Sequence, residues 1–134
     1  MTKTRNRADS ASPVTTDELL LDFLGELIGA AVLSRVWLLF FDDEHRPRPL
    51  IIPVDDIELD LIDETGLLSV ATLAGELARM AAAAEVVVVW ERPGANRLTI
   101  GERATVDALN RLFPPIPIRL RRQMLSHDDG VSLL

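Results

Sequence analysis

Cysteine and tyrosine are absent from this chain of 134 residues, and tryptophan occurs only as Trp37 and Trp90. Without cysteine there is no disulfide framework and no thiolate metal site. With so few large amphipathic aromatics, the stacking platforms of single-strand nucleic-acid binders are missing as well. No apolar run approaches the roughly 20 residues that a membrane-spanning helix needs. The expected protein therefore stays off the membrane and is cytoplasmic.

The chain has the length of one domain, and apolar residues make up 48% of it. The first thirteen residues are polar and are predicted to be a flexible tail. This segment contains Lys3, Arg5 and Arg7 but lacks the apolar core of a signal peptide. We therefore expect one tail, residues 1–13, and one domain, residues 14–134.

The net charge of −7 is unevenly distributed along the chain. Residues 9–64 carry fourteen acids against three bases, whereas residues 85–134 carry seven arginines against six acids. This asymmetry favours head-to-tail association or a basic partner. It argues against general nucleic-acid binding, which needs a net basic footprint. A solvated acidic surface that keeps the protein soluble is the simpler interpretation.

Hydrophobic patterns predict an α/β fold, a single three-layer domain in which a mixed β-sheet is flanked by helices. Strands are predicted at residues 36–41, 50–54, 86–89, 116–121 and 131–134. Pro53 cannot donate a ladder hydrogen bond, so its strand lies at an edge or ends there. Residues 55–64 form either a short outer strand or an extended loop, and residues 127–130 form a turn.

Three amphipathic helices are predicted between these strands. The first follows a capping box at Thr15 and Glu18, the second covers residues 67–84, and the third ends at about Phe113 before Pro114 and Pro115. Their predicted inward faces are Leu20, Phe23, Leu24, Leu27, Ile28 and Ala31; Val70, Leu73, Ala74, Leu77, Met80, Ala81 and Ala84; and Ile100, Ala104, Ala108 and Leu112.

The chain is organised around residues 85–102, which read as a buried valine strand, a Pro-Gly turn and a capped helix start. In open α/β sheets, ligands sit where such strands end. Trp90, Arg92, Thr99 and Glu102 are the candidate binding residues. A structural role is the simpler interpretation of each residue: Trp90 packs, Arg92 pairs with Glu91 or Glu102, and Thr99 and Glu102 form a capping box.

Two other clusters carry charge. Arg119, Arg121 and Arg122 lie on the predicted fourth strand, where they contact phosphate or an acidic partner, pair with residues 55–64, or form a solvated outer face; we favour the last. Residues 42–45 and 127–129 combine histidine with acids. Adjacent side chains in a turn point in different directions, and EF-hand spacing is absent. We therefore predict neither a metal site nor a cofactor.

The order of these elements resembles the JAB/MPN metalloprotease fold, above all its RadC-like branch. That family has a strand ending in Leu-Asp, an alanine-rich helix, a buried strand, and a loop His-x-His-Pro-x-Gly followed by Ser-x-x-Asp. The matching segments here are residues 40–43, 73–84, 86–89, 90–94 and 99–102. One deletion between Pro93 and Gly94 keeps the register through Thr99 and Glu102. The resemblance extends over about residues 35–125.

The departures from the family pattern concern its chemistry. The family binds zinc through the two histidines and the aspartate, with an upstream glutamate as general base. The histidine positions are Trp90 and Arg92 here, the aspartate position is Glu102, and the upstream glutamate falls near Arg35. Neither indole nor guanidinium binds zinc. The resemblance implies a member without metal, a non-catalytic domain that binds a protein partner or forms a homo-oligomer. The alternatives are a hydrolase or nucleotide-handling enzyme using residues 90–102, and phosphate binding by the arginine strand.

Overall fold

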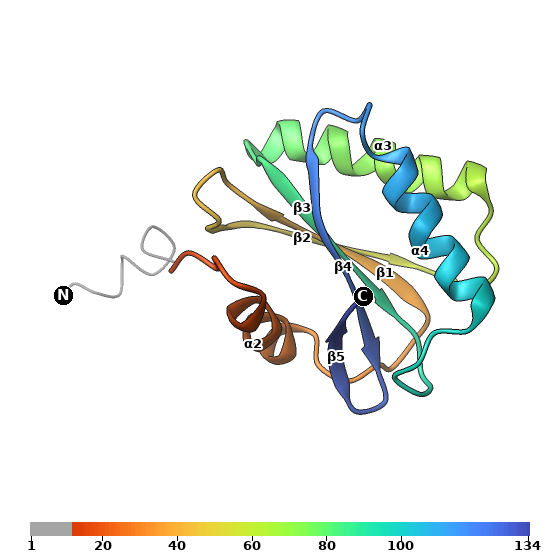
Figure 1. The fold of residues 1–134 in the computed structure, drawn as a ribbon. Helices are drawn as coiled ribbons and strands as arrows, with labels where there is room; N and C mark the ends of the chain where they lie inside the picture. Colours follow the sequence, from red (N-terminus) through yellow and green to blue (C-terminus); the bar gives the residue numbers. More distant parts are fainter. Residues whose placement is uncertain (1–11) are drawn as a thin grey trace.

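The computed structural model describes residues 12–134, so the first eleven residues of the predicted tail lie outside the described part of the chain. It shows one α/β domain with a five-stranded sheet and three helices (Figure 1). The strands are β1 (Arg35–Phe41), β2 (Pro47–Asp55), β3 (Glu85–Glu91), β4 (Arg119–His127) and β5 (Gly130–Leu133). The helices are α2 (Asp17–Leu27), α3 (Glu64–Ala81) and α4 (Ile100–Leu112). The predicted fold class is confirmed.

The sheet is mixed and has the strand order β2-β1-β3-β4-β5. Only β3 and β4 pair in parallel, and α4 makes the crossover between them. The pairs β1–β2, β1–β3 and β4–β5 are antiparallel. Strand β2 lies at an edge, as its proline predicts, and β5 forms the other edge.

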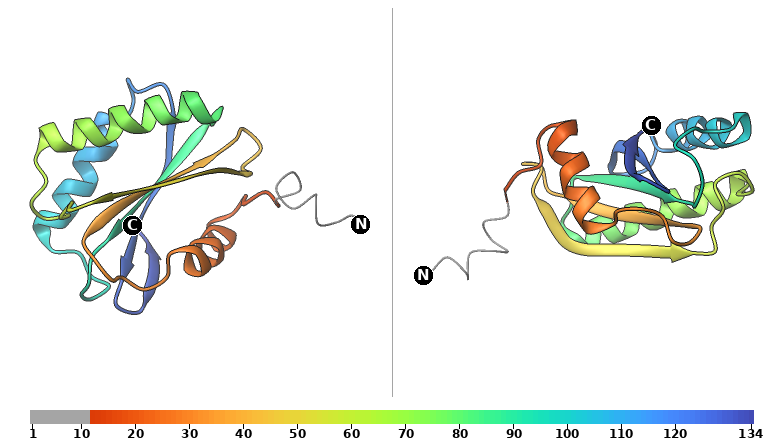
Figure 2. Two further views of the ribbon diagram at one scale, coloured as in Figure 1. Left: turned by 180° about the vertical axis from the view of Figure 1, so that it is seen from behind. Right: turned by 90° about the horizontal axis from the view of Figure 1, so that it is seen from below.

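Strand β3 occupies the centre of the sheet, and all seven of its residues are buried. Val86 and Val88 pack in the hydrophobic cluster formed with α3 and α4, while Val87 and Val89 pack in the cluster formed with α2. The views in Figure 2 show α2 across the sheet from α3 and α4. Four consecutive β-branched residues suit this position because neither side of β3 meets water.

Helix α2 begins one residue later than predicted. Its N-cap is Thr16, whose hydroxyl oxygen accepts the Leu19 amide at 3.1 Å, so the predicted capping box from Thr15 to Glu18 is wrong. The buried face consists of Leu20 and Leu24. The helix ends at Leu27, which is exposed, so Ala31 does not belong to its apolar face.

The inward faces predicted for α3 and α4 are also partly wrong. Met80 is 76% exposed and Ile100 is 92% exposed. Both helices are rich in alanine and carry apolar side chains on more than one face, so periodicity alone does not fix their orientation. The buried residues of α3 are Leu67, Val70, Ala71, Ala74, Gly75 and Ala78. Those of α4 are Glu102, Thr105, Val106 and Leu109.

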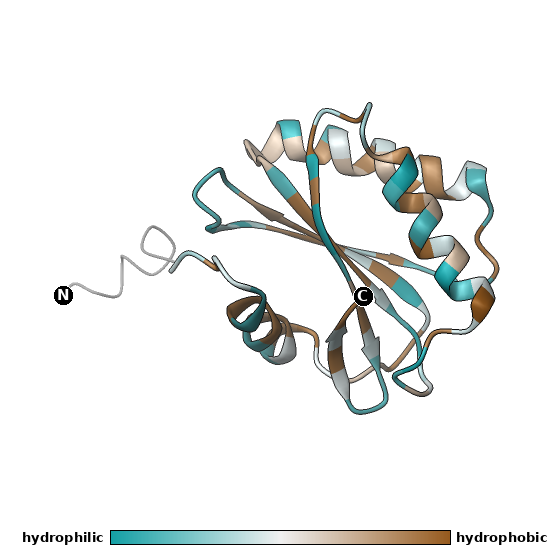
Figure 3. Cartoon of the chain, in the orientation of Figure 1, coloured by the Kyte–Doolittle hydropathy of each residue, from teal (hydrophilic) through white to brown (hydrophobic). Residues whose placement is uncertain are grey.

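The remaining segments follow the predicted order with different lengths. Residues 56–63 form a loop, so of the two predicted alternatives for residues 55–64 the extended loop is correct and the outer strand is not. The turn between β1 and β2 is polar, as predicted, and is coloured hydrophilic in Figure 3. Strand β4 continues to His127, well beyond the predicted end at Arg121. Its last five residues are buried on both sides, so they lack the alternation that marks a half-buried strand. No helix in residues 12–134 is long and apolar enough to cross a membrane.

Close packing between α3 and the segment after α4 gives the first testable prediction. An alanine Cβ at position 75 would lie 2.8 Å from Cγ2 of Ile116. We expect Gly75→Ala to lower the free energy of unfolding in urea by about 1–3 kcal/mol. The matched control is Gly25→Ala in α2, where a Cβ meets nothing within 4 Å. It should be neutral or stabilising by up to about 1 kcal/mol. If both variants gained stability equally, the close contact between position 75 and Ile116 would be contradicted.

Candidate functional site

The loop that follows β3 is fixed to the turn between β4 and β5. The Gly94 amide donates to Oδ1 of Asp128 at 2.9 Å, and the Asp128 amide donates to the Gly94 carbonyl at 3.0 Å. The Arg92 amide donates to the Ser126 carbonyl at 3.1 Å. Gly94 has φ of 128°, a value that side chains rarely permit. The predicted Pro-Gly turn is thus an anchored loop at the carboxyl ends of the parallel strands.

The guanidinium of Arg92 forms a bidentate ion pair with Glu102. Nε of Arg92 lies 2.8 Å from Oε2 of Glu102, and Nη2 lies 3.1 Å from Oε1. The same guanidinium donates to the carbonyls of Ala95 at 2.6 Å and Arg97 at 3.0 Å. Four hydrogen bonds thus engage a group with five N–H donors. The predicted ion pair is confirmed, and its partner is Glu102 rather than Glu91.

Glu102 also belongs to the capping box of α4, as the third residue of the helix. Its Oε1 accepts the Thr99 amide at 3.0 Å, and the Thr99 hydroxyl oxygen accepts the Glu102 amide at 3.0 Å. This confirms the predicted capping box. The hydrogen bonds from Arg92 hold the pKa of Glu102 below its ordinary value despite burial, and the Thr99 amide lowers it further. The carboxylate is consequently ionised and fully partnered at neutral pH.

Trp90 belongs to the core of the domain. Its side chain is 1% exposed, and its Nε1 donates to Oε1 of Gln123 at 2.8 Å. The amide group of Gln123 in turn donates to the Val106 carbonyl at 2.8 Å and to Oδ1 of Asn110 at 3.1 Å. The indole therefore links β3, β4 and α4, and it presents no surface to a ligand. The prediction that Trp90 packs is confirmed.

Sequence reasoning missed the most densely bonded carboxylate of the site, Glu91. Oε2 of Glu91 accepts the amides of Val32 at 2.6 Å and Leu33 at 3.0 Å. Oε1 accepts Nε of Arg35 and Nε1 of Trp37, both at 2.8 Å. Burial alone would raise the pKa of Glu91, but these donors bring it below its ordinary value. Glu91 thereby fixes the segment that leads into β1. Its signal in the sequence is an acid at the end of the buried strand, separated from the four valines only by Trp90.

A second missed carboxylate, Glu85, lies at the opposite end of β3. It is fully buried and contacts Arg119, Arg121 and His45, with Nδ1 of His45 at 2.8 Å and Nη1 of Arg121 at 3.1 Å. Burial would raise the pKa of Glu85, but the hydrogen bonds from His45 and Arg119 and the charge of Arg121 lower it.

These contacts correct the interpretation of the basic strand. Arg121 is 11% exposed at its side chain, and its guanidinium lies over the Phe41 ring, 5.4 Å from the centroid. Arg122 pairs with Asp17 of α2. The strand is therefore no solvated outer face, and among residues 12–134 its partners are Glu85 and Asp17 rather than the 55–64 segment. Of the three arginines, only Arg119 is largely exposed.

The two histidines have protein partners and gather no metal ligands. His45 contacts Glu85, and Nε2 of His127 lies 2.8 Å from the Ser132 hydroxyl. Asp42 accepts the amides of Glu44 and Arg46 within its own turn. In the described part of the chain, no group of three or more histidines and acids is arranged to hold a metal ion.

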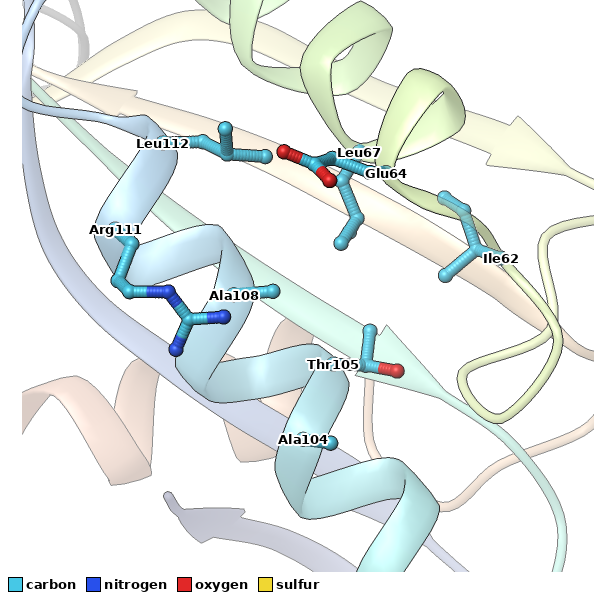
Figure 4. A pocket seen from close by; sticks show the side chains of 8 residues that line it. All are labelled: Ile62, Glu64, Leu67, Ala104, Thr105, Ala108, Arg111 and Leu112. Carbon is cyan, nitrogen blue, oxygen red and sulfur yellow. The ribbon is translucent and has the colours of Figure 1, made fainter.

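A cavity of about 380 Å³ lies between α3 and α4 (Figure 4). It contains none of the four residues proposed for the 90–102 loop. Ile62, Glu64 and Leu67 line one side, and the other side belongs to α4; the remaining lining residues are Ala104, Thr105, Ala108, Arg111 and Leu112. The structure thus separates the cavity from the ion pair at the start of α4.

The chain matches no protein-family model and no curated protein. The geometry itself places two of the four proposed loop residues, Arg92 and Glu102, in direct contact, joins Thr99 to them through the cap, and assigns Trp90 to the core. As they stand, these side chains stabilise the loop and the helix start. In this arrangement the Arg92 guanidinium and the Glu102 carboxylate engage each other rather than a ligand.

Proposed function

We propose that this chain is a non-catalytic α/β domain that acts in the cytoplasm by binding protein, with a second copy of itself among its partners. In this proposal it resembles a RadC-like JAB/MPN domain whose metal site has been replaced. The observation that carries the proposal is the bidentate contact between Arg92 and Glu102. In the alignment given above, Arg92 stands at the position of the family's second histidine and Glu102 at the position of its aspartate, so the contact joins these two positions.

The contact supports the resemblance through geometry and charge. Two ligands of one zinc ion must lie within a few ångströms of each other, and the side chains at these two positions are 2.8 Å apart at their closest atoms. The guanidinium carries a permanent positive charge. It meets one carboxylate and two carbonyl oxygens, so a fixed cation takes over the neutralising role that a metal ion would have.

The same contacts weaken the two alternatives. An enzyme that uses residues 90–102 needs Arg92 free to hold an anion and Glu102 free to transfer a proton, yet the two groups engage each other. Phosphate binding through the arginine strand needs unpaired guanidinium groups, but Arg121 and Arg122 pair with Glu85 and Asp17. The Arg92–Glu102 and Arg121–Glu85 pairs are largely buried, so separating either of them would cost several kcal/mol, whereas the Arg122–Asp17 pair is partly exposed to solvent.

Hydrolysis assays separate the proposal from the enzyme alternative. Phosphate and ester substrates are incubated with the wild-type chain and with Glu102→Gln, while light scattering and affinity capture report association. We expect equal background rates for both proteins, together with self-association or a captured partner. Activity that Glu102→Gln abolishes would establish an enzyme. A strictly monomeric chain that captures no partner would remove protein binding.

A further inference from the structure

An open groove lies between helices α3 and α4, and Figure 4 shows the side chains that line it. The groove is the cavity of about 380 Å³ described above, and its apolar lining consists of Ile62, Leu67, Ala104, Ala108 and Leu112. A groove of this kind between two helices is suited to an apolar side chain or a helix from another molecule.

Exposed apolar side chains belong to the same elements. Ile100, at the start of α4, is the most exposed large hydrophobic residue of residues 12–134, at 92%. It begins a row with Ala104, Ala108 and Leu112, spaced four residues apart on one face of the helix. Leu61 and Leu68, on the loop before α3 and on α3 itself, are 71% and 46% exposed. Leu61 and Leu68 are next in sequence to the lining residues Ile62 and Leu67, and Ile100 lies one turn before Ala104. Exposed apolar side chains thus occur on the same segments that line the groove, as in an interaction surface.

The groove also carries one charge of each sign. Glu64 stands in the first turn of α3, and Arg111 stands in the last turn of α4. Both line the groove, and among residues 12–134 neither belongs to an ion pair. A surface with one acid and one base is complementary to itself when a two-fold axis exchanges the two positions.

We propose that this groove binds a second copy of the chain in a two-fold symmetric dimer. Glu64 of each copy pairs with Arg111 of the other, and the apolar row that starts at Ile100 packs into the facing groove. Alanines at positions 104 and 108 allow the helices to approach closely. The groove carries one acid and one base, so a second copy supplies the complementary charge for both of them. The inference rests on the proposed protein-binding function and names its partner.

Charge reversal tests the pairing directly. Sedimentation equilibrium should find the wild-type chain dimeric, and Glu64→Arg or Arg111→Glu alone should weaken the dimer by about tenfold or more, because like charges then face each other at both contacts. An equimolar mixture of the two variants should recover wild-type affinity, since the heterodimer has opposite charges at both contacts. Glu76→Arg, an exposed reversal in α3 outside the groove, should leave the dimer unchanged.

An apolar pair of variants tests the row on α4. Ile100→Glu should dissociate the dimer, and Met80→Glu, at a similarly exposed position outside the groove, should not. Circular dichroism and urea midpoints confirm that each variant is folded. A monomeric wild-type chain, or a dimer that tolerates all the groove variants, would overturn the inference. A monomer that still captures another protein and hydrolyses nothing would leave the proposed function standing, whereas hydrolysis abolished by Glu102→Gln would remove that function independently.

Discussion

Replacing Glu91 with leucine is expected to lower the free energy of unfolding by about 3–5 kcal/mol, since it breaks a buried ion pair and leaves the other partner behind. Glu91 is 3% exposed and accepts two side-chain and two backbone donors. Leucine fills a similar volume but accepts no hydrogen bond. The Arg35 guanidinium, the Trp37 indole N–H and two amides then lose their acceptor at the same time.

Urea unfolding measures this loss, with two further variants as references. Glu91→Gln keeps the shape and one acceptor oxygen, so its loss should be smaller than that of the leucine variant. Glu76→Leu removes an exposed carboxylate from α3 and should change stability by no more than about 0.5 kcal/mol. Faster hydrogen exchange at the amides of Val32 and Leu33 should accompany Glu91→Leu. A urea midpoint equal to that of Glu76→Leu would refute the role assigned to Glu91.

Replacing Arg92 with methionine is expected to lower the free energy of unfolding by about 3 kcal/mol. The change leaves the Glu102 carboxylate buried without its cation and removes the donor from two loop carbonyls. A double-mutant cycle with Glu102→Gln isolates the interaction, and we expect a coupling energy of about 1–3 kcal/mol at neutral pH. Because Glu102→Gln retains the methylene stem and an amide oxygen, the cycle reports mainly the charged contact.

The pH dependence of this coupling follows from the lowered pKa of Glu102. A carboxylate whose folded pKa is depressed stabilises the fold fully above its unfolded pKa, which is about 4.3 for glutamate. The contribution is lost as the pH falls through the lower, folded pKa. The coupling between Arg92 and Glu102 should therefore be constant near neutrality and vanish in acid. A coupling near zero at pH 7, or one that persists unchanged in strong acid, would contradict the ion pair.

Local signals explain how much of this structure the sequence predicted. The valines of β3, the proline of the edge strand and the Thr99–Glu102 cap each depend on residues close in the chain, and all three are confirmed. The helix faces were partly wrong because alanine-rich helices present more than one apolar side. Ile100 was predicted to point inward because it continues a regular apolar row, but the cap and the ion pair turn Glu102 inward instead.

The roles of the two buried carboxylates were missed for a different reason. Glu85 and Glu91 flank the valine strand and look like solvated strand ends in the sequence. Their partners lie far away along the chain, since Glu91 meets Arg35 across 56 residues and Glu85 meets Arg119 across 34. The strand pairing creates those contacts, and no pattern of neighbouring residues predicts them. The burial of Arg121 was missed for the same reason.

The zinc content of the wild-type chain tests the proposal most directly, in which the Arg92–Glu102 pair occupies the place of the metal site in a JAB/MPN-like domain. The protein is purified without chelators, analysed by mass spectrometry, then saturated with zinc, exchanged into zinc-free buffer and analysed again. We predict no bound zinc in either sample, because indole and guanidinium are not metal ligands. A content of one zinc per chain in the wild type that is lost in Glu102→Gln would contradict the proposal and would favour the hydrolase alternative.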